Sequence, residues 1–255
     1  MRTVEFQAIY VMWLRQMKRF TRSKSRLAAM IIQPLFFLFI LGSGFGAARM
    51  PGLGEVGYID FLAPGIIAMA IMFSSMFTGV SVLWDKQFGF LQEVLVAPVS
   101  RISIIIGRTL GGATTALIQG FIILFIAIGL GVFASGGILG LLLTFIFMVL
   151  IAFTAVGFGL VIASKMKDFQ GFPLIMNLVM MPLLFLSSAF FPVVSNPILK
   201  TIAFLNPLFY MVDGLRGSLI GSSYVLVPIV NLIIVSLICI VMMTAGSYFF
   251  SKSEA

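Results

Sequence analysis

Side chains that carry out acid–base, nucleophilic or metal chemistry are scarce in this sequence of 255 residues. It contains 8 acidic residues, no histidine and one cysteine, Cys239, which lies inside an apolar run. These numbers exclude a disulfide framework, a zinc site built from Cys and His, and a catalytic triad that needs imidazole. We therefore expect no catalytic site in this chain, and we interpret Cys239 as a small apolar residue.

Nucleotide-binding motifs are also missing. The phosphate-binding loop of many ATPases, G-x-x-x-x-G-K-[ST], does not occur, so we expect the chain to hold neither ATP nor Mg. Gly42, Gly44 and Gly46 form a glycine-rich stretch, but they follow an apolar run rather than a strand, and their spacing differs from that of a dinucleotide site. The preferred interpretation of this stretch is the end of a helix.

The composition indicates a protein whose solvent is lipid. Hydrophobic residues make up 61% of the chain and charged residues 9%, with a mean hydropathy of +1.18. A soluble domain carries about 25% charged residues, because its surface must stay hydrated. We therefore expect one all-α integral membrane domain over residues 1–255. The net charge of +8 does not indicate nucleic-acid binding, because the basic residues flank apolar runs.

Six apolar runs are long enough to cross a bilayer, which requires roughly 20 residues. They predict transmembrane helices over residues 27–47, 61–83, 107–133, 139–164, 172–192 and 225–250. The segment 196–221 is too polar and too interrupted to span. In it, Asp213 and Arg216 are three residues apart and are expected to pair on one helical face. This segment predicts short external helices between spans five and six, which either lie on the external leaflet or dip into it as re-entrant helices.

The N-terminal segment 3–26 predicts an amphipathic helix in the plane of the membrane interface. Its apolar side chains recur at helical spacing, and the basic ones share the opposite face: Phe6, Ile9, Tyr10, Trp13, Met17 and Phe20 against Arg15, Lys18, Arg19 and Arg22. Two interpretations stay open, namely a membrane anchor and topology signal, or a strut that also touches a cytoplasmic partner. Of the 16 basic residues, 13 are predicted to lie on the same side of the membrane as this segment, so both termini are predicted to be cytoplasmic.

The predicted spans contain no charged side chains at depth. Residues 109–164, 169–199 and 217–251 lack Asp, Glu, Lys, Arg and His altogether. Carriers driven by protons need such groups to bind and relay the coupling ion. If this chain moves a solute, the energy is therefore expected to come from a separate ATPase subunit.

The loop 85–101 is the best candidate for docking such a subunit. It combines a short apolar stripe with an acidic side chain and a proline that stops the helix, a pattern that fits a groove on another protein. The residues singled out are Asp85, Lys86, Gly89, Leu91, Glu93, Leu95, Pro98 and Arg101. The alternative is an interfacial helix that contacts only lipid.

Four motifs in this order resemble those of type-2 ATP-binding-cassette (ABC) exporter permeases, most closely the daunorubicin-resistance-like permeases of bacteria and archaea. They are Tyr58 to Gly65, Gly89 to Arg101 followed by Gly107-Arg108, Met181 to Pro192, and Asn206-Pro207 with Tyr210 to Arg216. The chain departs from the family pattern at Asp85-Lys86 and Gly89 to Glu93.

The resemblance implies a homodimer of permeases in a prokaryotic plasma (inner) membrane, working with two ATPase subunits that bind the ATP and Mg. It also implies that segment 3–26 is a connecting helix and that 85–101 includes a cytoplasmic coupling helix. Spans two and five would line a central cleft that opens alternately to the two sides. The candidate lining residues are Ser74, Phe77, Thr78, Asn177, Phe185, Ser187 and Ser188.

An uncharged path suits a hydrophobic or amphipathic cargo, such as a drug-like molecule or a lipid, better than a small ion. Two alternatives stay open: an exporter of a lipid-linked saccharide, and a membrane scaffold subunit that transports nothing. An intramembrane enzyme is the least favoured class, because acid–base residues are missing from the spans.

The docking interpretation of loop 85–101 predicts that Glu93→Arg combined with Leu91→Asp disrupts association with the ATPase subunit. The double change reverses the charge and interrupts the apolar stripe, which removes both parts of the expected contact. Co-purification of the ATPase with the tagged chain measures the loss. Normal complex formation and normal ATP turnover in the double variant would show that the loop is not the dock.

Overall fold

The computed structural model describes residues 5–46, 56–87, 99–132, 136–166, 168, 170–193, 196–222 and 224–253. The side chains of Arg26, Lys86, Gln87, Arg101 and Ser253 are outside that description. The described residues form helices and connecting turns, with no strand among them. The helices are α1 (Phe6–Arg22), α2 (Lys24–Phe45), α3 (Tyr58–Gln87), α5 (Arg101–Gly129), α6 (Gly137–Lys165), α7 (Gly171–Phe185), α8 (Pro197–Leu205), α9 (Pro207–Ile220) and α10 (Pro228–Ser253).

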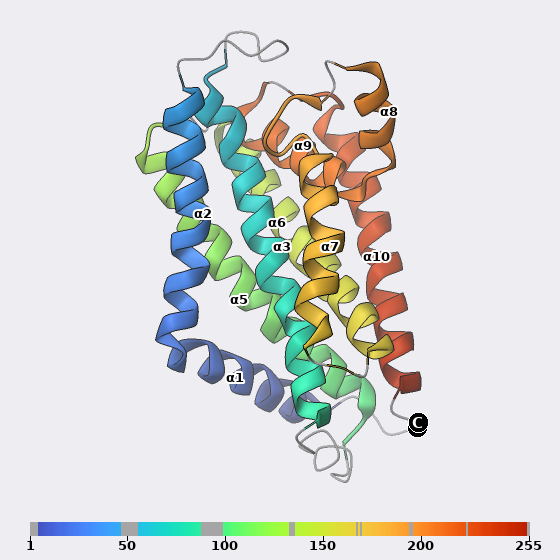
Figure 1. Cartoon of the computed structure of the whole chain (residues 1–255). Coiled ribbons are helices and arrows are strands. Elements are labelled where there is room, and N and C mark those ends of the chain that lie inside the picture. Colours follow the sequence, from blue (N-terminus) through green and yellow to red (C-terminus); the bar gives the residue numbers. More distant parts are fainter. Residues whose placement is uncertain are drawn as a thin grey trace.

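Five of these helices, α2, α3, α5, α6 and α10, are long and apolar enough to cross a membrane. They run alongside one another in a bundle, with α1 lying across one end and α8 and α9 gathered at the other (Figure 1). We call these the α1 end and the α9 end. The all-helical multi-pass membrane fold predicted from the sequence is confirmed. By the charge distribution, the α1 end is the one predicted to be cytoplasmic.

The fifth predicted span differs from its prediction. Helix α7 has 15 residues and ends at Phe185, whereas a helix had been expected to continue to Pro192. Its length of about 22 Å is less than the roughly 30 Å of a hydrocarbon core. Ser188 has a φ of 60°, in the left-handed region, which a continuing α-helix does not allow. Residues 186–193 complete the path to the α9 end without forming an α-helix.

Helix α1 ends earlier than the predicted connecting helix, because the chain turns at Ser23 and α2 begins at Lys24. One face of α1 packs on α5. There the indole N–H of Trp13 donates to the Thr114 hydroxyl at 3.2 Å, and the Glu5 backbone N–H donates to the Ser103 hydroxyl at 3.0 Å. The tyrosine and phenylalanine nearest the N-terminal end of α1, Tyr10 and Phe6, stay exposed. The helix therefore combines an internal packing face with an exposed apolar edge.

Helix α3 is the central element of the bundle. It contacts α2, α5, α6 and α9, and most of its residues are buried. Gly79 of α3 lies directly against Gly159 of α6, so that a Cβ at Gly79 would overlap the Gly159 carbonyl. Small residues allow such close approach between membrane helices, where packing rather than the hydrophobic effect drives association.

The two charged residues of the predicted external segment lie on α9, but their bonds differ from the expected mutual pair. Arg216 is fully buried; its Nε and Nη2 donate to the Phe61 carbonyl at 3.2 and 3.1 Å, and Nη2 donates to the Ser188 carbonyl at 2.7 Å. Its guanidinium also lies 3.8 Å from the centre of the Phe61 ring. Arg216 thus holds the start of α3 and the segment after α7 to α9.

Asp213, in the middle of α9, bonds to a different part of the chain from Arg216. Its carboxylate accepts the backbone N–H groups of Val225 and Leu226 at 2.8 and 2.9 Å and the side-chain amide of Asn231 at 2.8 Å. These bonds connect α9 to the start of α10. Helices α8 and α9 meet at 98°, and Asn206 caps α9 by accepting the Leu208 N–H at 2.9 Å.

The contact between Gly79 and Gly159 predicts that Gly79→Ala lowers the free energy of unfolding by about 1–3 kcal/mol, because the two backbones must separate to admit a methyl group. Gly44→Ala in α2 is the matched control, since a Cβ there meets nothing within 4 Å. Thermal unfolding in detergent measures both changes. Equal melting temperatures for the two variants would contradict the close packing of α3 on α6.

Candidate functional site

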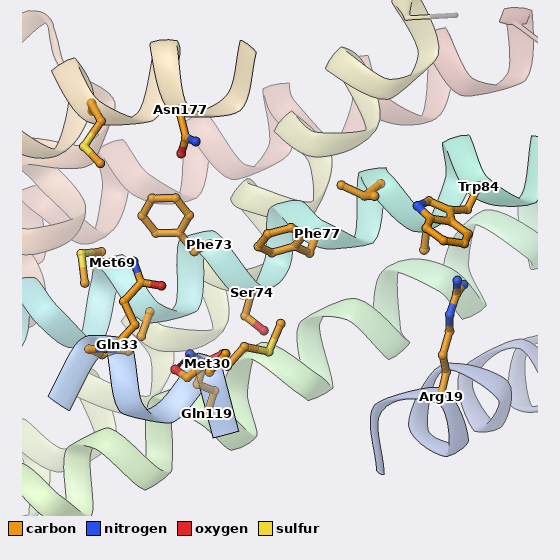
Figure 2. A pocket seen from close by; sticks show the side chains of 16 residues that line it. Arg19, Met30, Gln33, Met69, Phe73, Ser74, Phe77, Trp84, Gln119 and Asn177 are labelled. Atoms are coloured by element: carbon orange, nitrogen blue, oxygen red, sulfur yellow. Dashed lines mark hydrogen bonds between the residues drawn. The ribbon is translucent and has the colours of Figure 1, made fainter. Parts of the chain in front are cut away.

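A cavity of about 590 Å³ opens between α2, α3, α5 and α7, with α1 at one end. Ligand sites in proteins are typically about 300–1,000 Å³. Figure 2 shows Phe73 and Phe77 of α3 along its length, Asn177 of α7 facing Phe73, and Arg19 with Trp84 at the α1 end. The lining side chains are Arg19, Ala29, Met30, Gln33, Pro34, Met69, Ala70, Phe73, Ser74, Phe77, Val80, Ser81, Trp84, Gln119, Asn177 and Met181.

The cavity wall is mainly apolar and aromatic, with a few neutral polar groups. Three helices each contribute one side-chain amide, namely Gln33 from α2, Gln119 from α5 and Asn177 from α7. Ser74 and Ser81 add hydroxyls from α3, and Arg19 is the single charged residue among the lining side chains. Such a surface can bind an apolar body and hydrogen-bond its neutral polar groups.

Two polar atoms in this wall have no hydrogen-bond partner among the described residues. The Gln119 side chain is only 4% exposed; its amide N–H donates to the Met30 carbonyl, while its Oε1 accepts nothing. Ser74 is also 4% exposed, and its hydroxyl has no described partner. Both atoms are enclosed by the surrounding packing, and a buried polar atom without a partner costs about 1–3 kcal/mol.

The predicted pathway residues divide into two groups. Ser74, Phe77 and Asn177 line the cavity, and Thr78 lines a small adjoining hollow shared with Gln16 of α1. The structure thus brings four of the seven to one place, although their part in transport stays a prediction.

The other three predicted pathway residues lie after or at the end of α7. Phe185 is half exposed and packs against Phe190, with ring centres 5.5 Å apart. The Ser187 hydroxyl donates to the Leu184 carbonyl at 2.7 Å, and the Ser188 hydroxyl donates to the Phe191 carbonyl at 3.2 Å. Both serine hydroxyls are hydrogen-bonded to backbone carbonyls, and neither serine lines the cavity.

An ion cluster at the α1 end of the cavity joins three helices. The carboxylate of Asp85, at the end of α3, accepts two hydrogen bonds from Arg15 of α1 at 3.0 and 2.8 Å. Arg108 of α5 reaches the same carboxylate at 2.9 Å, and Arg19 lies 3.9 Å from it. Asp85 and Arg108 are buried, and Arg15 and Arg19 are partly exposed. The cluster therefore fixes α1 against the α3 turn that precedes segment 88–98.

Asp85 had been predicted to contact a partner ATPase, and that contact remains a prediction. The structure gives its carboxylate an internal role, with only 6% of the residue exposed. The other predicted docking features, Gly89, Leu91, Glu93, Leu95, Pro98 and the side chains of Lys86 and Arg101, lie outside the described residues. Within the described part, no three side chains of His, Cys, Asp or Glu gather where they could hold a metal.

Comparison with known families decides what kind of membrane protein carries this cavity. Residues 7–220, from the start of α1 to the end of α9, match the model of the family described as ABC-2 type transporter. This chain belongs to the ABC-2 type transporter family. It is a permease subunit of an ABC transporter and a multi-pass membrane protein.

Curated relatives of this ABC-2 permease carry transport names. It is 29% identical to the putative transport permease ycf38 of Cyanophora paradoxa, over 82% of this chain and 73% of the relative. It is 29% identical to the daunorubicin resistance ABC transporter permease protein DrrB1 of Streptomyces coeruleorubidus, over 69% of this chain and 62% of the relative. It is 25% identical to the inner membrane transport permease YadH of Escherichia coli K12, over 85% of this chain and 84% of the relative.

Several side chains of the ABC-2 permease site escaped the sequence interpretation. Gln33 and Gln119 could have been found by the criterion that singled out Asn177, because an amide in an apolar span is costly without a partner. Arg15 and Arg19 had been placed on the basic face of the amphipathic helix and Arg108 in a family motif, but none of them had been predicted to contact Asp85. Their convergence on Asp85 joins residues far apart in sequence, so spacing alone did not reveal it.

The ion cluster predicts that Asp85→Asn destabilises the permease by about 3–5 kcal/mol, because the buried Arg108 loses its ion pair with Asp85. The double variant Asp85→Asn with Arg108→Met should recover part of that loss. Chemical unfolding of the four proteins in detergent measures the coupling. Additive effects of the two changes would show that Asp85 and Arg108 do not interact energetically.

Proposed function

We propose that this ABC-2 permease exports a hydrophobic or amphipathic cargo, either a drug-like molecule or a lipid, using ATP hydrolysed by a partner subunit. The observation that carries the proposal is the cavity between α2, α3, α5 and α7. It is apolar along Phe73 and Phe77, contains neutral hydrogen-bonding groups, and has its one lining cation at the α1 end. A small ion would need charged or carbonyl ligands along the path instead.

The proposed energy input enters at the α1 end, which the positive-inside rule makes cytoplasmic in a prokaryotic inner membrane. The ion cluster supports this proposal because Asp85, the first residue of the predicted docking loop, joins α1 to the last turn of α3. Movement of that loop by an ATPase would be transmitted directly to α1, α3 and α5. Those three helices border the cavity. Closure of two ATPase subunits would therefore open the cavity alternately to the two sides of the membrane.

A homodimer is proposed as the working unit. Gln33 and Asn177 border the cavity yet are exposed on the surface of the single chain. An amide facing hydrocarbon without a partner costs several kcal/mol, whereas a second permease across the opening would supply partners and a shared cleft.

Reconstitution with the ATPase subunit tests the export proposal. We expect cargo to stimulate ATP hydrolysis and labelled cargo to cross the membrane only with ATP. Phe77→Ala should weaken the apparent affinity for cargo about threefold to tenfold, because it removes part of the apolar wall. Phe185→Ala is the matched control, since that ring lies outside the cavity lining.

Two results would contradict the proposal. Hydrolysis without movement of any labelled drug or lipid would favour the scaffold alternative. An equal effect of the Phe77 and Phe185 substitutions on cargo affinity would show that this cavity is not where the cargo binds.

A further inference from the structure

An open groove of about 950 Å³ lies at the elbow where α1 ends and α2 rises from it (Figure 1). One face of α1 and the first residues of α2 line it. Among the described residues, Arg19 is the one that lines both this groove and the cavity between α2, α3, α5 and α7. A ligand of the groove is therefore distinct from the proposed cargo, and its binding does not depend on the proposed function.

The groove carries positive charge that its own helices do not balance. Lys18, Arg22 and Lys24 line it, are exposed, and form no ion pair with any described residue. Helices α1 and α2 contain no Asp or Glu. Lys18 and Arg22 are four residues apart on α1, where like charges repel one another. An anion bound between these side chains would relieve the repulsion.

Two hydroxyls accompany the cations. Ser23 and Ser25 also line the groove, and the Ser23 side chain makes no capping hydrogen bond to the start of α2. Hydroxyl and ammonium or guanidinium donors side by side match the oxygens of a phosphate, which accepts charge-assisted hydrogen bonds from several directions. The groove therefore has the donor set of a phosphate site.

An exposed apolar stripe leads away from the groove along α2. Ser25, Ile32, Phe36 and Phe39 are separated by seven, four and three residues, so they share one face of the helix. The three apolar side chains are 62%, 62% and 69% exposed. From Ser25 to Phe36 the helix rises about 16 Å, close to half of the roughly 30 Å hydrocarbon core. The stripe thus extends across about one leaflet.

The combination of groove and stripe favours a lipid over other anions. A soluble phosphate or an acidic protein segment would use the cations and leave the stripe without a partner. A phospholipid uses both, and Val11 and Leu14 add apolar surface to the groove itself. Gln33, which the proposed homodimer would cover, lies about 100° around α2 from Ile32, so a second permease leaves the stripe open.

We propose that the elbow between α1 and α2 binds an anionic phospholipid of the leaflet at the α1 end. Its phosphate lies among Lys18, Arg22 and Lys24, and an acyl chain lies along Ile32, Phe36 and Phe39. By the charge distribution this is the cytoplasmic leaflet, whose anionic lipids attract basic segments next to membrane spans.

Quenching by brominated lipids tests the proposal at the stripe. The full chain with Trp13→Phe and Trp84→Phe has no other tryptophan, so Ile32→Trp places a single reporter on the stripe. The protein is reconstituted in phosphatidylcholine bilayers in which a fraction of the lipid is replaced by phosphatidylglycerol or phosphatidylcholine with brominated chains. Thr244→Trp in the same background is the matched control: Thr244 is exposed on α10, eight residues from Lys252, as Ile32 is from Lys24.

We expect the Ile32→Trp reporter to show about fivefold tighter binding of phosphatidylglycerol than of phosphatidylcholine, the effect of one cation beside an anionic headgroup. Arg22→Gln with Lys24→Gln should bring the two lipids to within about twofold, because two of the groove cations are removed. Lys165→Gln with Lys252→Gln removes the same charge from the same end of the bundle, outside the groove, and should leave the preference unchanged.

Equal binding of the two lipids at the Ile32→Trp reporter would overturn the proposal, as would an equal preference at the Thr244→Trp reporter. So would equal losses in the two double variants, because the preference would then come from overall charge and not from the groove. Glycerol phosphate, which has the phosphate but no acyl chains, should not displace the lipid. Its displacement of phosphatidylglycerol would show that the groove is a site for a soluble anion.

Discussion

Charge is tolerated in this bundle only where it is compensated, and that constraint governs the rest of the structure. An uncompensated charge in a low-dielectric interior is costly, so buried ions are paired or hydrogen-bonded. Buried charges of the described part lie towards the two ends, Asp85 with Arg108 at the α1 end and Asp213 with Arg216 at the α9 end. Each set joins several helices, and the stretch between them is neutral.

The two ends are joined by different kinds of bond. At the α1 end, a carboxylate is shared among guanidinium groups of α1 and α5, an arrangement that charge or hydration at the interface can alter. At the α9 end, Arg216 binds the backbone carbonyls of Phe61 and Ser188, and Asp213 binds backbone N–H groups. Helix α3 takes part in both sets of bonds, through Asp85 at the α1 end and through Phe61 at the α9 end. When the Asp85 end of α3 moves, the bonds from Arg216 to Phe61 therefore restrain the opposite end of the helix.

Much of the fold was predictable, because hydropathy and length identify membrane helices directly. Leu27 to Ala47, for example, reads as a span without any tertiary information, and α2 covers almost all of it. The end of the fifth helix was not predictable in this way. Its end at Phe185 depends on the conformation of Ser188, whose carbonyl is held by an arginine 28 residues further along the chain.

The residues of the candidate site were also predictable only in part. Ser74, Phe77 and Asn177 were identified because the family resemblance implies that spans two and five line a cleft and these are polar or aromatic residues on those spans; all three line the cavity. Phe185, Ser187 and Ser188 were chosen on the same grounds, but the helix they were expected to extend ends at Phe185. The link between Arg15 and Asp85, 70 residues apart, needed the folded positions of α1 and α3.

Between the two charged ends, the described part of the bundle has no buried Asp, Glu, Lys or Arg that could relay a coupling proton, so we expect the energy for transport to come from another subunit. The most direct measurement is uptake of a labelled amphiphile by proteoliposomes that contain this chain alone, with a proton or sodium gradient and no ATPase subunit. We expect the amphiphile only to equilibrate, whatever the direction or size of the gradient. Accumulation against its own gradient in these vesicles would show that the chain couples transport to an ion by itself.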